Sequence, residues 1–110
     1  MANRHDLFGE APEQAPELRA RWKRLVMKEM PSEAAQRDWP VHLDHCFARI
    51  LLDNACGKAW REVITPPAWR NAPPPVLQRA IRLGEAVLAG HADLHALNQK
   101  SLAYRGKLRR

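Results

Sequence analysis

The sequence predicts an all-α fold, a small bundle of about four helices with a proline-rich central loop. In several segments apolar side chains recur every three or four residues, which is the spacing that places them on one face of an α-helix. No segment of useful length shows the alternation of apolar and polar residues that is typical of a strand. Five prolines fall within residues 65–75, and they favour a stiff, partly polyproline-like loop between the helices.

A chain of 110 residues has the length of one domain. Residues 1–14 contain Gly9 and Pro12 and have no sustained period, so we expect a flexible N-terminal arm. The helical domain is predicted over residues 15–105, and a basic tail is predicted over residues 106–110.

The first predicted helix begins at Pro16, because a proline at the first position of a helix lacks only an N–H that would have no partner there. Pro31 is predicted to end this helix, and Ser32 to cap a short helical turn that follows. The apolar face of the helix consists of Leu18, Trp22, Leu25 and Val26.

The strongest amphipathic pattern predicts a second helix over Val41–Cys56, which Gly57 ends. Its polar residues Asp44, Arg49 and Asp53 are predicted to face water. Its buried stripe is predicted to consist of Leu43, Cys46, Phe47, Ile50 and Leu51.

A third long helix is predicted to begin at Pro75 and to end at Gly90, and a last helix covers His91–Tyr104. Gly84 lies on the apolar face of the third helix, where the lack of a side chain lets another helix approach closely. The other residues of that face are Leu77, Ala80, Ile81, Val87 and Leu88.

The net charge of +6 arises entirely after residue 40. Residues 1–40 carry seven basic and seven acidic side chains, whereas residues 41–110 carry eleven Lys or Arg and five Asp or Glu. The chain after Asp93 contains no acid. A one-sided positive charge attracts phosphates or acidic protein surfaces through a field that does not depend on sequence.

Two tryptophans, Trp60 and Trp69, are each followed by an arginine, a combination that suits stacking on nucleic-acid bases. The same rings also suit packing within a small core, and the basic tail also suits a solvated fringe. The residues predicted to bind nucleic acid are Arg61, Trp69, Arg70, Lys100, Tyr104, Arg105, Lys107, Arg109 and Arg110.

Two pairs of residues have the four-residue spacing that places them on one helical face: His42 with Cys46, and His91 with His95. Facing one another, these pairs could supply four ligands to zinc, although a buried cysteine and solvated histidines explain them better. Zinc is therefore a weak expectation, and no other cofactor is predicted. No phosphate-binding glycine loop, catalytic triad or pair of carboxylates is discernible, so no catalytic residue is assigned.

The first twenty residues contain charged side chains and no apolar run, and no later stretch reaches the length of a membrane span. Two cysteines are too few for a disulfide framework. We therefore expect a cytoplasmic protein that does not bind membranes. Within the arm, Asp6-Leu7-Phe8 is an acidic-hydrophobic peptide that resembles the end of the peptides with which bacterial replication proteins dock on the sliding clamp, and it also suits a latch onto the domain itself.

The segments DHCFARILLDNACGKAW (44–60), PAW (67–69) and LNQKSLAYRGK (97–107) resemble a family of small bacterial proteins commonly labelled GNAT-type N-acetyltransferases. The label implies acetyl transfer from acetyl-CoA on a mixed α/β fold.

The leading functional hypothesis is a small, non-enzymatic basic helical module that binds nucleic acid or a nucleic-acid-associated protein. The alternative is an enzyme, either the acyltransferase that the resemblance implies or a metal-dependent activity at the His/Cys pairs.

Overall fold

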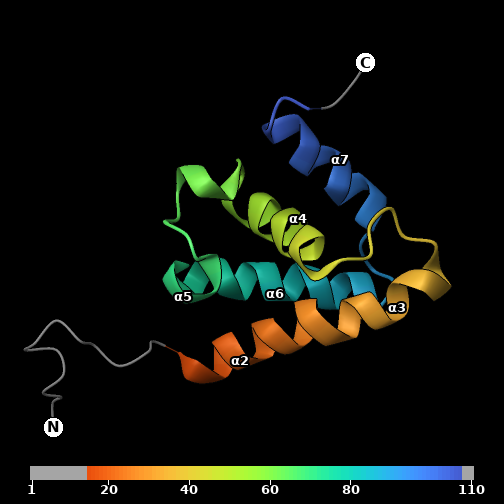
Figure 1. Cartoon of the computed structure of the whole chain (residues 1–110), viewed down its shortest axis with the longest axis horizontal. Coiled ribbons are helices and arrows are strands. Elements are labelled where there is room, and N and C mark those ends of the chain that lie inside the picture. Colours follow the sequence, from red (N-terminus) through yellow and green to blue (C-terminus); the bar gives the residue numbers. More distant parts are fainter. Residues whose placement is uncertain (1–14, 108–110) are drawn as a thin grey trace, which may run out of the picture.

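The structure is a computed structural model, and it describes residues 15–107. Helix makes up 73% of it, four of the helices have seven residues or more, and no strand occurs among the described residues. The predicted all-α bundle of about four helices is thereby confirmed. Figure 1 shows the first helix, residues 16–37, lying alongside α6 (Pro74–Leu88). Helix α4 (Asp44–Cys56) packs against both of them, and α7 (Leu94–Tyr104) packs against α4.

The first helix runs straight through Pro31, where the sequence predicted a break. It consists of α2 (Pro16–Arg24), a π-helical segment η1 (Leu25–Glu29) and α3 (Met30–Arg37). An α-helical turn would bring the ring of Pro31 against the carbonyl four residues earlier. The wider π turn, in which the N–H of Met30 donates to the carbonyl of Leu25, accommodates the proline. Ser32 does not cap a new helix; its hydroxyl donates to the carbonyl of Lys28 at 2.7 Å.

Helix α4 (Asp44–Cys56) begins three residues later than predicted, because Leu43 is extended and is the N-cap. Leu43 is consequently exposed rather than buried, and Cys46 is only half-buried. Phe47, Ile50 and Leu51 are fully buried, as predicted. The predicted stop at Gly57 is also confirmed, since this glycine has the left-handed φ of 75° that a side chain rarely tolerates.

The proline-rich loop contains more helix than predicted. A 3₁₀ turn, η2 (Trp60–Glu62), precedes it, and one α-helical turn, α5 (Ala68–Asn71), forms between its two groups of prolines. Five residues, 68–72, separate the two groups of prolines; the first four form the helical turn, and Ala72 is its extended C-cap. The prolines therefore limit the length of the helix without excluding it.

Helix α6 (Pro74–Leu88) and helix α7 (Leu94–Tyr104) complete the fold. Gly84 of α6 is buried against the first helix and α4, as predicted: a Cβ there would lie 2.6 Å from Cδ2 of Leu25 and 3.0 Å from Cδ1 of Leu51. Helix α7 begins at Leu94 rather than His91, because the carboxylate of Asp93 accepts the N–H of His95 and caps the helix there.

None of the helices formed by residues 15–107 is both long enough and apolar enough to cross a membrane. The predicted arm, residues 1–14, and the last three residues of the predicted tail lie outside the described residues.

Candidate functional site

An open groove of about 850 Å³ lies between the first helix, α4, η2 and α5. We call it the tryptophan groove. Apolar groups supply most of its surface, and charged groups stand among them. Its lining residues are Trp22, Lys23, Val26, Met27, Asp44, His45, Ala48, Arg49, Leu52, Trp60, Arg61, Pro66, Pro67, Ala68, Trp69 and Arg105.

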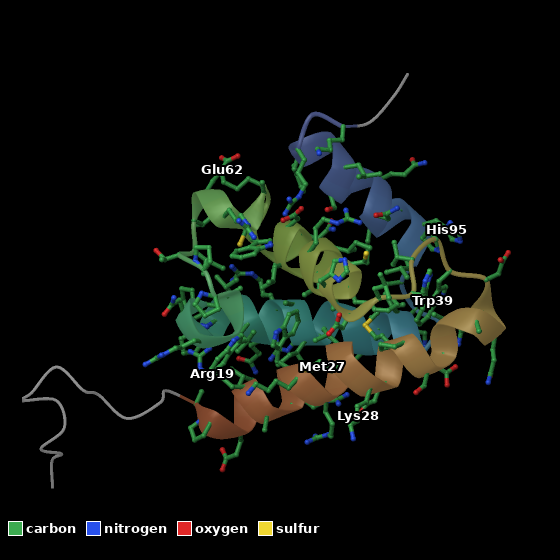
Figure 2. All side chains as sticks on the ribbon, in the orientation of Figure 1. Arg19, Met27, Lys28, Trp39, Glu62 and His95 are labelled. Carbon is green, nitrogen blue, oxygen red and sulfur yellow. The ribbon has the colours of Figure 1, made fainter. Side chains whose placement is uncertain are left out.

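One wall of the groove, α5, is held by the buried side chain of Arg19, which is 3% exposed. Its guanidinium donates to the carbonyl of Trp69 at 2.7 Å and to the carbonyl of Ala72 at 3.0 Å. Figure 2 shows Arg19 between α2 and α5. Arg19 thus binds the backbone of Trp69, and this residue is 41% exposed beside the groove.

The opposite end of the groove is organised by Asp53 of α4, which has no exposed surface. One carboxylate oxygen accepts the backbone N–H of Trp60 at 2.8 Å, and the other accepts the hydroxyl of Ser101 at 2.6 Å. Arg105 donates to both oxygens, from Nε at 2.6 Å and from Nη2 at 2.9 Å. A single buried carboxylate thus ties η2, α7 and the residue after α7 to α4.

These contacts correct two sequence-based predictions. Asp53 was expected to face water, and Arg105 was expected to be one of the cations after Asp93 that no acid opposes. A carboxylate is almost never fully buried unless it is paired, and here the partner is 52 residues away in the sequence. The hydrogen bonds to Asp53 raise the pKa of Arg105 above its ordinary value, so this cation is committed to the fold.

Two cations lie over the tryptophan rings that border the groove. Nζ of Lys23 is 4.3 Å from the centre of the Trp69 ring, and the guanidinium carbon of Arg61 is 5.1 Å from the centre of the Trp60 ring. Both distances are within the range of a cation–π interaction. The rings therefore hold positive charge at the edge of an apolar surface.

A third cation, Arg49 of α4, is held by neutral partners: it donates to the hydroxyl of Ser101 at 2.8 Å and to the side-chain oxygen of Asn98 at 2.9 Å. The ion pairs within residues 15–107 involve Arg21, Arg24, Arg37, His45 and Arg105. In that part of the chain Lys23, Arg49 and Arg61 therefore line the groove without a carboxylate partner.

The structure divides the residues that were predicted to bind nucleic acid. Arg61, Trp69 and Arg105 line the groove. Arg70 is exposed on α5 beside it, whereas Lys100 and Tyr104 are exposed on α7 and Lys107 is exposed after α7. None of these last four lines the groove. Arg109 and Arg110 lie outside the described residues.

The zinc candidates do not form a site. Residues 15–107 contain no group of three or more His, Cys, Asp or Glu side chains that could hold a metal ion. The expected helical spacing is lost because His42 precedes α4 and His91 precedes α7, whereas Cys46 and His95 lie within those helices. Burial raises the pKa of the other thiol, Cys56, above its ordinary value, which disfavours the nucleophilic thiolate at neutral pH.

The contribution of Lys23 and Met27 of the first helix to the groove was not predicted from the sequence. Lys23 and Met27 are four residues apart and share a helical face, next to the buried face that carries Trp22 and Val26. Met27 is 56% exposed. The available signal was a methionine one helical turn after a lysine. This pair indicates a binding surface only once α5 is known to lie beside the first helix.

Comparison of the sequence with models of protein families and with curated proteins, and of the structure with solved structures, found no match.

Proposed function

We propose that this protein is a non-enzymatic binding module whose tryptophan groove holds single-stranded nucleic acid. The observation that carries the proposal is the set of three cations, Lys23, Arg49 and Arg61, around an aromatic groove without carboxylate partners among the described residues. Proteins that bind single strands combine a positively charged groove with aromatic rings on which bases stack. In this arrangement the phosphates would contact the cations, and the bases would lie against Trp60 and Trp69.

The size of the groove supports a ligand of this kind. About 850 Å³ is within the range of about 300–1,000 Å³ that is usual for clefts that bind small ligands, and the groove is open to solvent so that a chain could pass through it. The rings come from η2 and α5, and the cations from α2, α4 and η2, so a bound strand would contact several elements at once. Bases stacked inside a duplex would offer no free faces to these rings.

Three observations favour binding over catalysis. No metal-ligating cluster occurs within residues 15–107, and the pKa of Cys56 is raised rather than lowered. The described residues also form no strand, whereas the acetyl transfer implied by the GNAT resemblance requires a mixed α/β fold. A catalytic role would have to rest on groups that these residues do not bring together.

An acidic, apolar protein segment is the second candidate for the groove. Met27, Pro66 and Pro67 offer apolar contacts that bases do not require, and methionine is frequent on surfaces that bind proteins. The experiment below distinguishes this candidate, because a groove built for a protein segment would show no preference for single strands.

The test is fluorescence anisotropy of labelled single-stranded and duplex oligonucleotides with the full chain, over a series of salt concentrations. We expect Lys23→Ala to weaken single-strand binding and to flatten the slope of log affinity against log salt by about 0.7. Trp69→Ala should weaken it by about 5- to 150-fold, which corresponds to about 1–3 kcal/mol per stacked base. The fold should tolerate Trp69→Ala, because Arg19 holds the backbone of that residue.

Lys28→Ala is the matched control, since Lys28 is also an exposed lysine of the first helix but does not line the groove. Figure 2 shows Lys28 projecting from the outer side of that helix. Equal affinities and equal salt slopes for the Lys23 and Lys28 variants would remove the groove as the nucleic-acid site.

A further inference from the structure

We infer that the chain's own N-terminal segment, residues 1–14, binds the tryptophan groove and competes with nucleic acid, with Leu7 and Phe8 against Met27 and Trp69. This inference concerns the regulation of the same groove and therefore rests on the proposed function. Residues 1–14 are outside the described structure, and their sequence, their covalent attachment and the groove itself support the inference.

The segment and the groove have opposite charges. Residues 1–14 carry one arginine and three acids, Asp6, Glu10 and Glu13, whereas the remainder of the chain carries seventeen Lys or Arg and nine acids. Asp6 precedes Leu7-Phe8 directly, and Glu10 follows it after one glycine. Acids on both sides of an apolar pair match a groove in which cations stand at the edge of an apolar surface.

The groove also offers the apolar contacts that Leu7 and Phe8 require. Met27 is 56% exposed and Trp69 is 41% exposed, and both line the groove. Aromatic rings and methionine are favourable partners for an aromatic side chain. Apart from Met1, Leu7 and Phe8 are the large apolar residues of the segment, and they are adjacent.

The covalent connection lets the segment reach the groove. Phe8 lies seven residues before Ala15, a separation that an extended chain spans over about 23 Å. Lys23 and Met27 lie eight and twelve residues after Ala15 along the helix, at about 12 Å and about 18 Å. Both are within reach when the segment folds back along α2.

Tethering makes a weak contact effective. A segment on a short linker has an effective concentration in the millimolar range at a site that it can reach. A contact with a dissociation constant of about 1 mM would thus occupy the groove for a substantial fraction of the time. Nucleic acid would have to displace it, and the apparent affinity for the oligonucleotide would fall by a few fold.

The test compares the full wild-type chain with the full chain carrying Leu7→Ser and Phe8→Ser, first without nucleic acid. In two-dimensional NMR spectra, we expect the indole N–H signal of Trp69 to shift in the double variant and that of Trp39, which does not line the groove, to stay. Ala2→Ser with Gln14→Ala is the matched control in the same segment, and it should move neither signal.

The second measurement is oligonucleotide affinity, which should be a few fold tighter for the Leu7/Phe8 double variant than for the wild type. An unchanged Trp69 signal would overturn the inference. If the wild type and the double variant both bound single strands in that case, the proposed function would still stand. A shifted Trp69 signal with no oligonucleotide binding by either protein would retain the docked segment and overturn the proposed function.

Discussion

Replacing Arg105 with alanine should destabilise the fold severely, even though this residue lies near the end of the chain. The substitution removes both hydrogen bonds that Arg105 donates to Asp53, at 2.6 Å and 2.9 Å, and leaves a carboxylate with no exposed surface and no cation. Breaking a buried ion pair from one side costs about 3–5 kcal/mol, because the remaining charge is uncompensated. A small domain has a free energy of unfolding of about 5–15 kcal/mol, so this loss is a large part of the total.

The assay is urea unfolding followed by circular dichroism. With a slope of about 2 kcal/mol per molar urea, the midpoint should fall by about 2 M in Arg105→Ala. Arg105→Lys keeps the charge but loses the fork of two donors, so its midpoint should lie between those of the wild type and the alanine variant. Lys107→Ala is the matched control, since Lys107 is exposed and forms no ion pair within residues 15–107, and its stability should change by less than about 0.5 kcal/mol.

A loss below about 1 kcal/mol in Arg105→Ala would refute this account of Asp53. It would mean that the carboxylate gains water or another partner when the guanidinium is removed. The same result would restore Arg105 to the cations without an acidic partner that the sequence predicted after Asp93.

Three further predictions concern the core and the thiols. Phe47→Ala should cost about 3–5 kcal/mol in urea unfolding, because the ring has no exposed surface. Gly84→Ala should lower the melting temperature although alanine favours helix, since the new Cβ would lie 2.6 Å from Cδ2 of Leu25. A higher melting temperature would show that the side chain of Leu25 moves aside. In a Cys46→Ser background, the rate of alkylation of Cys56 should rise at a higher pH in the folded protein than in urea, because burial raises the pKa of its thiol. Coincident pH profiles of the alkylation rate would contradict that shift.

The raised pKa of the Cys56 thiol also makes the stability of the fold depend on pH. A thiol whose pKa is raised on folding keeps its proton longer in the folded state than in the unfolded state. Cys56 therefore contributes no stability below its unfolded pKa, and its contribution becomes unfavourable as pH rises above that value.

The helices could be predicted because they depend on local spacing. Phe47 and Ile50 are buried as their three-residue separation on an apolar face predicts, and Gly84 is where two helices approach. The break at Pro31 was predicted wrongly, because a π turn accommodates a proline without ending the helix.

The candidate site could be predicted only in part. The sequence singled out Trp69 and Arg61, since a ring beside a cation is visible in a local pattern. Polarity predicted that Asp53 faces water and that Arg105 is a cation without an acidic partner, because nothing in the local sequence relates two residues 52 positions apart. Lys23 was not predicted for the same reason, because its role depends on α5. Arg19 of α2 holds α5 in place by a hydrogen bond to Trp69, which lies 50 residues later in the sequence.

The most direct test of the central claim is an NMR titration of the full chain with a short single-stranded oligothymidylate, followed through the indole N–H signals. Trp60 and Trp69 line the groove, whereas Trp39 packs edge-on against Phe47 at 5.7 Å and does not line it. We predict that the signals of Trp60 and Trp69 shift progressively with added oligonucleotide, that the Trp39 signal stays, and that added salt reverses the shifts. Binding that moves Trp39 alone, or that leaves Trp60 and Trp69 unchanged, would contradict the assignment of the groove as the nucleic-acid site.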